Sequence, residues 1–119
     1  MSEDEYLIWS SEVDGTGVVH ALGLLDLNAR AELVRMLAQA SGSGRDVVVD
    51  LSGTTFIDST GLKALVDTWR SQTAAGRGFV LRNLSARVRL TVGYAGLADV
   101  LPIDTDSGVG AQPFRRERP

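Results

Sequence analysis

The alternation of apolar and polar residues near the N-terminus predicts two short strands joined by a tight turn. The β-like runs cover residues 6–13 and 18–25, and Asp14-Gly15-Thr16-Gly17 separates them. Asp-Gly between two apolar runs is typical of a hairpin, because both residues tolerate the positive φ angles that its turn requires. We therefore expect an antiparallel pair of strands at the start of the chain.

A helical period follows, from Asn28 to about Ala40. Its apolar residues recur so that one face of the helix is apolar and the charged residues point elsewhere. Asp26 or Asn28 would cap the first turn, and the Ser-Gly-Ser-Gly sequence at 41–44 would end the helix. The predicted buried face consists of Ala29, Leu33, Met36, Leu37 and Ala40.

The central part of the chain is residues 46–70. Three consecutive valines at 47–49 suit a strand that is covered on both faces. We expect a loop after Leu51, then the apolar pair at 56–57, and then the turn Asp58-Ser59-Thr60-Gly61. The apolar period then becomes helical, at i, i+3, i+4 and i+7. The residues of this second helix face are Leu62, Leu65, Val66 and Trp69.

The remaining pattern predicts a strand at 79–81 and a third helix that begins after Ser85. We expect this helix to carry Val88, Leu90, Val92 and Tyr94, and expect residues 97–103 to form a last turn or a short edge strand. The order β-β-α-β-α-β-α predicts an α/β fold in which helices pack against a mixed sheet. Residues 1–104 would form this domain. Residues 105–119 have no apolar period, which predicts a flexible C-terminal tail.

Composition narrows the range of possible functions. A chain of 119 residues is one domain, and its net charge of −3 does not suit a nucleic-acid-binding surface. With no cysteine and one histidine, the chain lacks the residues for disulfides, thiolate metal sites or a histidine cluster. No apolar run reaches the ~20 residues of a membrane span, and the acidic N-terminus is not signal-like. We expect a cytoplasmic protein that needs no cofactor.

The turn at 58–61 is the strongest candidate for chemistry. It joins a buried strand to a helix N-terminus, where free N–H groups and the helix dipole favour an anion. Asp58 or Ser59 would serve as the N-cap. A cap hydroxyl at Ser59 would still be accessible to another enzyme, so a structural and a regulatory role remain compatible.

The chain offers no catalytic apparatus around this turn. The one histidine, His20, lies in a predicted strand, and Ser59 lacks the Gly-x-Ser-x-Gly context of a serine hydrolase. Lys63 does not fit a phosphate-binding P-loop. The carboxylates of Asp50 and Asp58 are separated by a predicted loop. We therefore expect a binding module rather than an enzyme.

The motif Asp50-Leu-Ser-Gly-Thr-Thr-Phe-Ile-Asp-Ser-Thr-Gly-Leu62 resembles the central motif of the STAS domain family, specifically the bacterial anti-sigma factor antagonists. The resemblance implies a roughly four-stranded mixed sheet flanked by three to four helices. It also implies that Ser59 is phosphorylated by an anti-sigma factor that is itself a serine kinase. The unphosphorylated form would bind that anti-sigma factor and release the sigma factor, and a protein phosphatase would reverse the modification.

On the same resemblance we expect the partner to contact the turn and its surroundings. Thr60 is the second choice for phosphorylation. Asp26 would border this surface or only cap a helix, Gly61 would allow close approach of a partner or only start a helix, and Lys63 would contact a partner or remain solvated. The predicted partner-binding residues are Asp26, Asp58, Ser59, Thr60, Gly61, Leu62 and Lys63.

Two other interpretations remain open at this point. STAS domains also serve as subunits of lipid-transport ATPase complexes and of large stress-signalling scaffolds, where phosphorylation need not control them. A small nucleotide-binding or hydrolytic α/β protein is the other interpretation.

Overall fold

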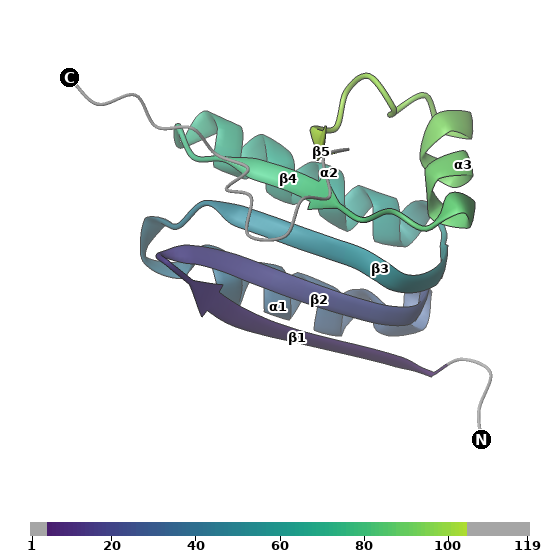
Figure 1. Ribbon diagram of the computed structural model, residues 1–119, viewed down its shortest axis with the longest axis horizontal. Helices are drawn as coiled ribbons and strands as arrows, with labels where there is room; N and C mark the ends of the chain where they lie inside the picture. Colours follow the sequence, from purple (N-terminus) through teal and green to yellow (C-terminus); the bar gives the residue numbers. More distant parts are fainter. Residues whose placement is uncertain (1–4, 105–119) are drawn as a thin grey trace.

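A single five-stranded sheet organises the molecule (Figure 1). The computed structural model describes residues 5–104. The strand order is β1-β2-β3-β4-β5, with β1 antiparallel to β2 and the other neighbours parallel. The mixed sheet is therefore confirmed, with a very short fifth strand added at one edge. The strands are β1 (Tyr6–Val13), β2 (Thr16–Leu25), β3 (Val47–Ile57), β4 (Phe79–Arg82) and β5 (Ile103–Asp104).

Two helices cover one face of this sheet. Figure 1 shows α1 (Arg30–Ser41) and α2 (Ser59–Ala74) together behind the strands, whereas α3 (Ala86–Tyr94) lies at the end of the sheet where β3 finishes. Single 3₁₀ turns, η1 (Leu27–Ala29) and η2 (Gly42–Gly44), flank α1. The predicted apolar face of the first helix is confirmed, since all five of its residues are buried. Of the second predicted face, Leu62 and Leu65 are buried, while Val66 and Trp69 pack partly buried against the core.

The predicted hairpin is confirmed. Asp14 and Gly15 both have positive φ, 51° and 82°, and Val13 pairs with Thr16 across the turn. These angles match a two-residue turn whose twist suits the flanking strands. The strand after the turn begins at Thr16, slightly earlier than the alternation indicated.

The loop expected after Leu51 is wrong, because β3 runs without interruption to Ile57. The polar residues at 52–55 stay in the strand by pairing with β2, with register shifts between His20 and Leu22 and between Gly23 and Leu24. Thr54 is buried there, and its Oγ1 donates to the Ala21 carbonyl oxygen at 2.8 Å. This irregular but continuous pairing places the end of β3 directly beside the end of β2.

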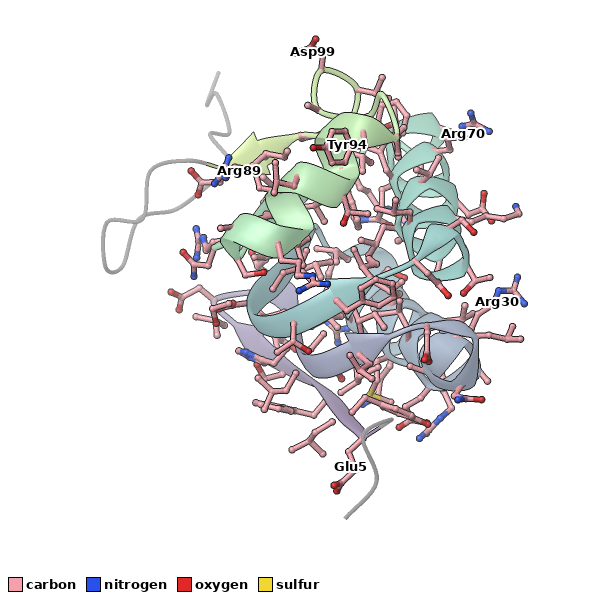
Figure 2. The ribbon with its side chains drawn as sticks, turned by 90° about the vertical axis from the view of Figure 1, so that its right-hand side faces the viewer. Glu5, Arg30, Arg70, Arg89, Tyr94 and Asp99 are labelled. Atoms are coloured by element: carbon pink, nitrogen blue, oxygen red, sulfur yellow. The ribbon has the colours of Figure 1, made fainter. Side chains whose placement is uncertain are left out.

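The third helix begins as expected but buries fewer residues. Ser85 Oγ accepts from the Val88 N–H at 3.3 Å, so Ser85 is the N-cap. Val88 and Val92 are buried, whereas Leu90 is exposed and Tyr94 lies on the outer surface of α3 (Figure 2). Residues two apart lie on nearly opposite sides of a helix, so 88 and 92 share a face that excludes 90 and 94.

The predicted tail at 105–119 lies outside the described residues. Within residues 5–104, no helix has the length and apolar content that crossing a membrane requires.

Candidate functional site

The candidate site is the junction between β3 and α2. β3 ends at Ile57 and α2 begins at Ser59, so Asp58 alone connects them. Asp58 has an extended backbone (φ −106°, ψ −173°), and its N–H donates to the Leu25 carbonyl oxygen at 3.2 Å. This bond fixes the start of α2 against the end of β2.

Asp58 is the N-cap of α2. Its Oδ1 accepts three hydrogen bonds, from the Thr60 N–H at 2.9 Å, the Gly61 N–H at 3.1 Å and the Thr60 hydroxyl at 2.6 Å. A carboxylate in this position satisfies N–H groups of the first turn that have no partner within the helix. The choice between Asp58 and Ser59 as the cap is therefore settled in favour of Asp58.

Ser59 is consequently not needed to cap α2. It is the first residue of α2, its side chain is exposed, and its hydroxyl makes no hydrogen bond with any residue in the described part of the chain. Thr60 differs, because it is only half-exposed and its hydroxyl is committed to Asp58. The geometry favours Ser59 over Thr60 as the hydroxyl that another protein can reach.

The surroundings of Asp58 favour its charged form. Partial burial desolvates the carboxylate and opposes ionisation. Against this, the Thr60 hydroxyl and the backbone N–H groups of Gly61 and Thr60 donate to it, and the nearby Leu27 N–H also favours the charged form. The hydrogen bonds outweigh the desolvation, and the pKa of Asp58 lies below its ordinary value. A fixed negative charge therefore stands directly beside Ser59.

This lowered pKa predicts a pH-dependent contribution to stability. The folded state binds the Asp58 proton less tightly than the unfolded chain, so the contribution is complete above the unfolded pKa and is lost as pH falls through the folded pKa. Asp58→Ala should lower the free energy of unfolding by ~1 kcal/mol at neutral pH, as expected for an N-cap. Urea unfolding followed by circular dichroism should show this difference shrinking below about pH 4.

Asp58→Asn serves as the matched control, because asparagine also caps helices but does not titrate. It should stay close to wild type at neutral pH. A difference between wild type and Asp58→Ala that is the same at neutral and acidic pH would contradict the lowered pKa.

The loop that follows β2 lies against this turn. Asp26 caps η1 by accepting the Asn28 N–H at 3.0 Å, so Asp26 rather than Asn28 is the capping residue. The adjacent Leu27 N–H lies close to the Asp58 carboxylate and helps to lower its pKa. The strands β2 and β3 are parallel neighbours, so their C-terminal ends lie side by side. The turn capped by Asp26 and the turn capped by Asp58 follow these two ends. The turn that begins at Asp26 and the turn at Asp58 are therefore neighbours, and a place for Asp26 on a partner surface stays a prediction.

Gly61 and Leu62 must be removed from the predicted contact surface. Both are buried, and Leu62 belongs to the core. A Cβ atom at Gly61 would lie 2.6 Å from the Leu25 carbonyl oxygen, so the backbone that approaches this glycine is the protein's own. Lys63 remains on the surface, where its Nζ lies 2.9 Å from Asp67 Oδ2.

Two exposed apolar residues beside the turn were missed from the sequence. Leu27 is 69% exposed and Phe56 is 37% exposed, although both are large and hydrophobic. Leu27 lies outside the predicted apolar face of the first helix, and this position could have indicated that its side chain is exposed. Phe56 belongs to the apolar pair at 56–57, and the pattern there gives no sign that one member is exposed. Leu27 adds exposed apolar area in the loop beside the turn and Phe56 adds it near the end of β3, and exposed apolar area of this kind is common at protein contact sites.

The other candidate groups lie apart from the turn. His20 is a half-buried strand residue whose ring stacks on Trp9 at a centroid distance of 4.9 Å. Asp50, within β3, accepts from the Ser52 N–H at 2.9 Å and from Asn83 Nδ2 at 3.4 Å. Residues 5–104 hold no cluster of three acidic, histidine or cysteine side chains that could bind a metal ion.

Comparison with known proteins agrees with this architecture. The family model for the STAS domain matches residues 10–109. The anti-sigma-B factor antagonist of Bacillus subtilis (strain 168) is 30% identical over 94 residues, which is 79% of this chain and 86% of that protein.

Solved structures show the same fold. An anti-sigma factor antagonist from Mycobacterium paratuberculosis superposes with a TM-score of 0.80 at 23% identity, covering 89% of this chain and 91% of that one. The Bacillus cell fate determinant SpoIIAA in its phosphorylated form superposes with a TM-score of 0.65 at 21% identity, covering 84% and 93%.

Proposed function

The chain belongs to the STAS domain family, and from this premise we propose that it is an anti-sigma factor antagonist controlled by phosphorylation of Ser59. The unphosphorylated form binds an anti-sigma factor with serine kinase activity, and the sigma factor is thereby released. A protein phosphatase restores the binding-competent form, and the exchange takes place in the cytoplasm. The single observation that carries this proposal is the exposed, unengaged hydroxyl of Ser59 at the start of α2.

The relatives support the proposal. The B. subtilis protein, which shares 30% of its residues over most of both chains, is an anti-sigma-B factor antagonist. SpoIIAA, which has the same fold, exists in a phosphorylated form. The proposal transfers antagonism and phosphorylation to this chain and assigns the modification to Ser59.

The partner surface consists of the two capped turns and the start of α2. Asp58 fixes the turn, Ser59 presents the acceptor hydroxyl, and Leu27 and Phe56 supply apolar contact area. Gly61 and Leu62 support this surface from beneath by packing against the end of β2 and the core. The residues proposed to face the partner are Asp26, Leu27, Phe56, Asp58, Ser59, Thr60 and Lys63.

The chain is the substrate of this reaction rather than its catalyst. A kinase must bring the γ-phosphate of ATP in line with the attacking oxygen, so the acceptor hydroxyl must project from the surface. Ser59 meets this condition, and the positive end of the α2 dipole offsets part of the phosphate charge once it is attached. The modified domain can therefore keep its fold while its binding surface changes charge.

The proposal is tested with purified anti-sigma factor kinases of the source organism. Each is incubated with the full chain and ATP, and the 59–60 peptide is then examined by mass spectrometry. Ser59→Ala should still bind the kinase in a pull-down but incorporate no phosphate, since alanine removes only an exposed oxygen. Thr60→Ala is the matched control and should be phosphorylated at Ser59.

Phosphate incorporation into Ser59→Ala at the wild-type rate would refute the assignment of the residue. Stable capture of a membrane ATPase instead of a kinase would refute the antagonist function itself.

A further inference from the structure

The outer edge of β1 is a long strand edge with no partner in the described chain. β1 has eight residues, and among residues 5–104 it pairs with β2 alone. In a hairpin with a two-residue turn, the pair next to the turn exchanges hydrogen bonds, and the pattern then alternates. Val13, Ser11, Trp9 and Leu7 therefore bond to β2. The backbone N–H and C=O groups of the even-numbered residues from 6 to 12 point away from the sheet.

Most of the usual devices that protect a strand edge are missing from β1. Proteins shield such edges with very short strands, bulges, proline or charged side chains, lysine above all. The opposite edge, β5, has only two residues, whereas β1 pairs with β2 in unbroken register and contains neither proline nor a basic residue. Its single charge, Glu12, lies 3.2 Å from Arg45 Nε. Within residues 5–104 no other segment pairs with this edge, so it can accept another strand.

The side chains of β1 supply apolar contact area next to this edge. Ile8 is buried toward α1, so the odd-numbered residues point to the face of the sheet away from that helix. On this face Leu7 is 57% exposed, Trp9 40% and Val13 56%. The Trp9 ring is held in place by stacking on His20, with an interplanar angle of 14°. An ordered, exposed indole costs little entropy to bury at an interface.

We propose that β1 pairs antiparallel with β1 of a second copy of this chain, about a two-fold axis that passes beside Trp9. Antiparallel pairing is the one arrangement in which a two-fold axis makes an edge complementary to itself. Centred on residue 9, it places the outward backbone groups of Ile8 opposite Ser10 of the other copy, and those of Tyr6 opposite Glu12. All eight outward-pointing residues of the two strands then find hydrogen-bonding partners.

The centre at Trp9 is chosen over the alternative at Ser10. A centre at Ser10 also matches the backbone groups, but it sets Trp9 opposite Ser11. A centre at Trp9 makes the two indoles a directly opposed, non-hydrogen-bonded pair, in which side chains approach most closely. Aromatic pairs at such positions add stability beyond that of smaller residues.

The resulting dimer leaves both regulatory sites free. The axis stands perpendicular to the sheet, so ten strands form one sheet with α1 and α2 of both copies on the same face. Ser59 follows the end of β3, near the start of β1, and the two-fold axis places the two serines at opposite ends of the dimer. The dimer therefore presents two Ser59 side chains at once.

The interface is small, which makes the dimer weak and concentration-dependent. Stable pairs bury roughly 800 Å² on each partner, more than one eight-residue edge and its flanking side chains provide. Sedimentation velocity of the full chain should therefore show monomer at low micromolar concentration and a growing dimer fraction toward the millimolar range. A single monomer species at every concentration would overturn the proposal.

Two edge variants locate the interface. Ser10→Pro removes an outward N–H and places a ring in the path of the second strand, and Leu7→Lys adds a charge beside the edge. Each should weaken dimerisation at least tenfold while the circular dichroism of the monomer is kept. Leu90→Lys, on the exposed side of α3, is the matched control and should dimerise as wild type. Unchanged dimerisation of a folded edge variant would overturn the proposal.

The two tryptophans test the register. Coupled indoles give an exciton couplet in the far-ultraviolet circular dichroism spectrum, which should grow with the dimer fraction. It should vanish in Trp9→Phe and persist in Trp69→Phe, since Trp69 packs against the core within one copy. A dimer blocked by Ser10→Pro but lacking the couplet would overturn the pairing at Trp9. These measurements involve no kinase, so their outcome is separate from that of the proposed function.

Discussion

Replacing Ser59 by glutamate should weaken binding of the unmodified anti-sigma factor by about a hundredfold, which corresponds to ~3 kcal/mol. The substitution introduces a permanent negative charge at the position proposed for phosphorylation. Isothermal titration calorimetry with the purified anti-sigma factor measures the change directly. The free energy of unfolding should change little, because Ser59 is exposed and a negative charge at the first position of a helix is favourable.

The direction of this effect follows from the position of Asp58. Its carboxylate accepts three hydrogen bonds and its lowered pKa keeps it charged, so a second negative charge at residue 59 meets a like charge close by. In the free protein, water screens the pair. At an interface the water is removed, and the repulsion and the desolvation of the new charge both act against the complex.

Ser71→Glu is the matched control for this experiment. It makes the same chemical change on the same helix at another exposed serine, twelve residues or ~18 Å further along α2. Its affinity for the anti-sigma factor should stay within a few-fold of wild type. If the two glutamate variants bind equally well, the charge at residue 59 does not control the complex.

Local signals predicted most of the fold. The hairpin followed from Asp14-Gly15, whose positive φ angles the structure confirms. The caps at Asp26 and Ser85 and the buried face of α1 likewise depend on residues only a few positions apart. Such features are decided within one turn or one hairpin, so the sequence displays them directly.

The errors arose where distant contacts override local preference. Residues 52–55 are small and polar and resemble a loop, yet β2 supplies the pairing that keeps them in β3. The buried hydrogen bond from Thr54 to Ala21, 33 residues away, has no local signature. In the third helix, the apolar residues recur every second position, so the helical period leaves Leu90 and Tyr94 outside the core.

In the candidate site, too, local signals were predicted correctly and contacts between distant residues were not. The motif predicted that Asp58 and Ser59 belong to the site, but it could not decide which of them caps α2, because that depends on which side chain accepts from the N–H groups of Thr60 and Gly61. Gly61 was expected at the partner surface. Gly61 instead has no room for a side chain because the backbone of Leu25 lies against it. Leu25 belongs to β2 and stands 36 residues earlier in the sequence.

Gly61→Ala should destabilise the domain by about 2 kcal/mol, the cost of forcing extra atoms into a packed site. The added Cβ would lie 2.6 Å from the Leu25 carbonyl oxygen and 2.8 Å from Ile57 Cγ1. The carbonyl belongs to the backbone and accepts the Asp58 N–H, so it cannot move without loosening the bond that fixes the start of α2. Urea unfolding at neutral pH measures the change.

Gly93→Ala is the matched control, because it makes the same substitution inside α3, where an added Cβ meets nothing within 4 Å. Alanine should stabilise that helix by about 0.5–1 kcal/mol through its higher helix propensity. The two variants should therefore shift stability in opposite directions. Equal stabilisation by both would show that β2 and α2 do not approach closely at Gly61. The turn that presents Ser59 would then have to be fixed by the Asp58 cap alone.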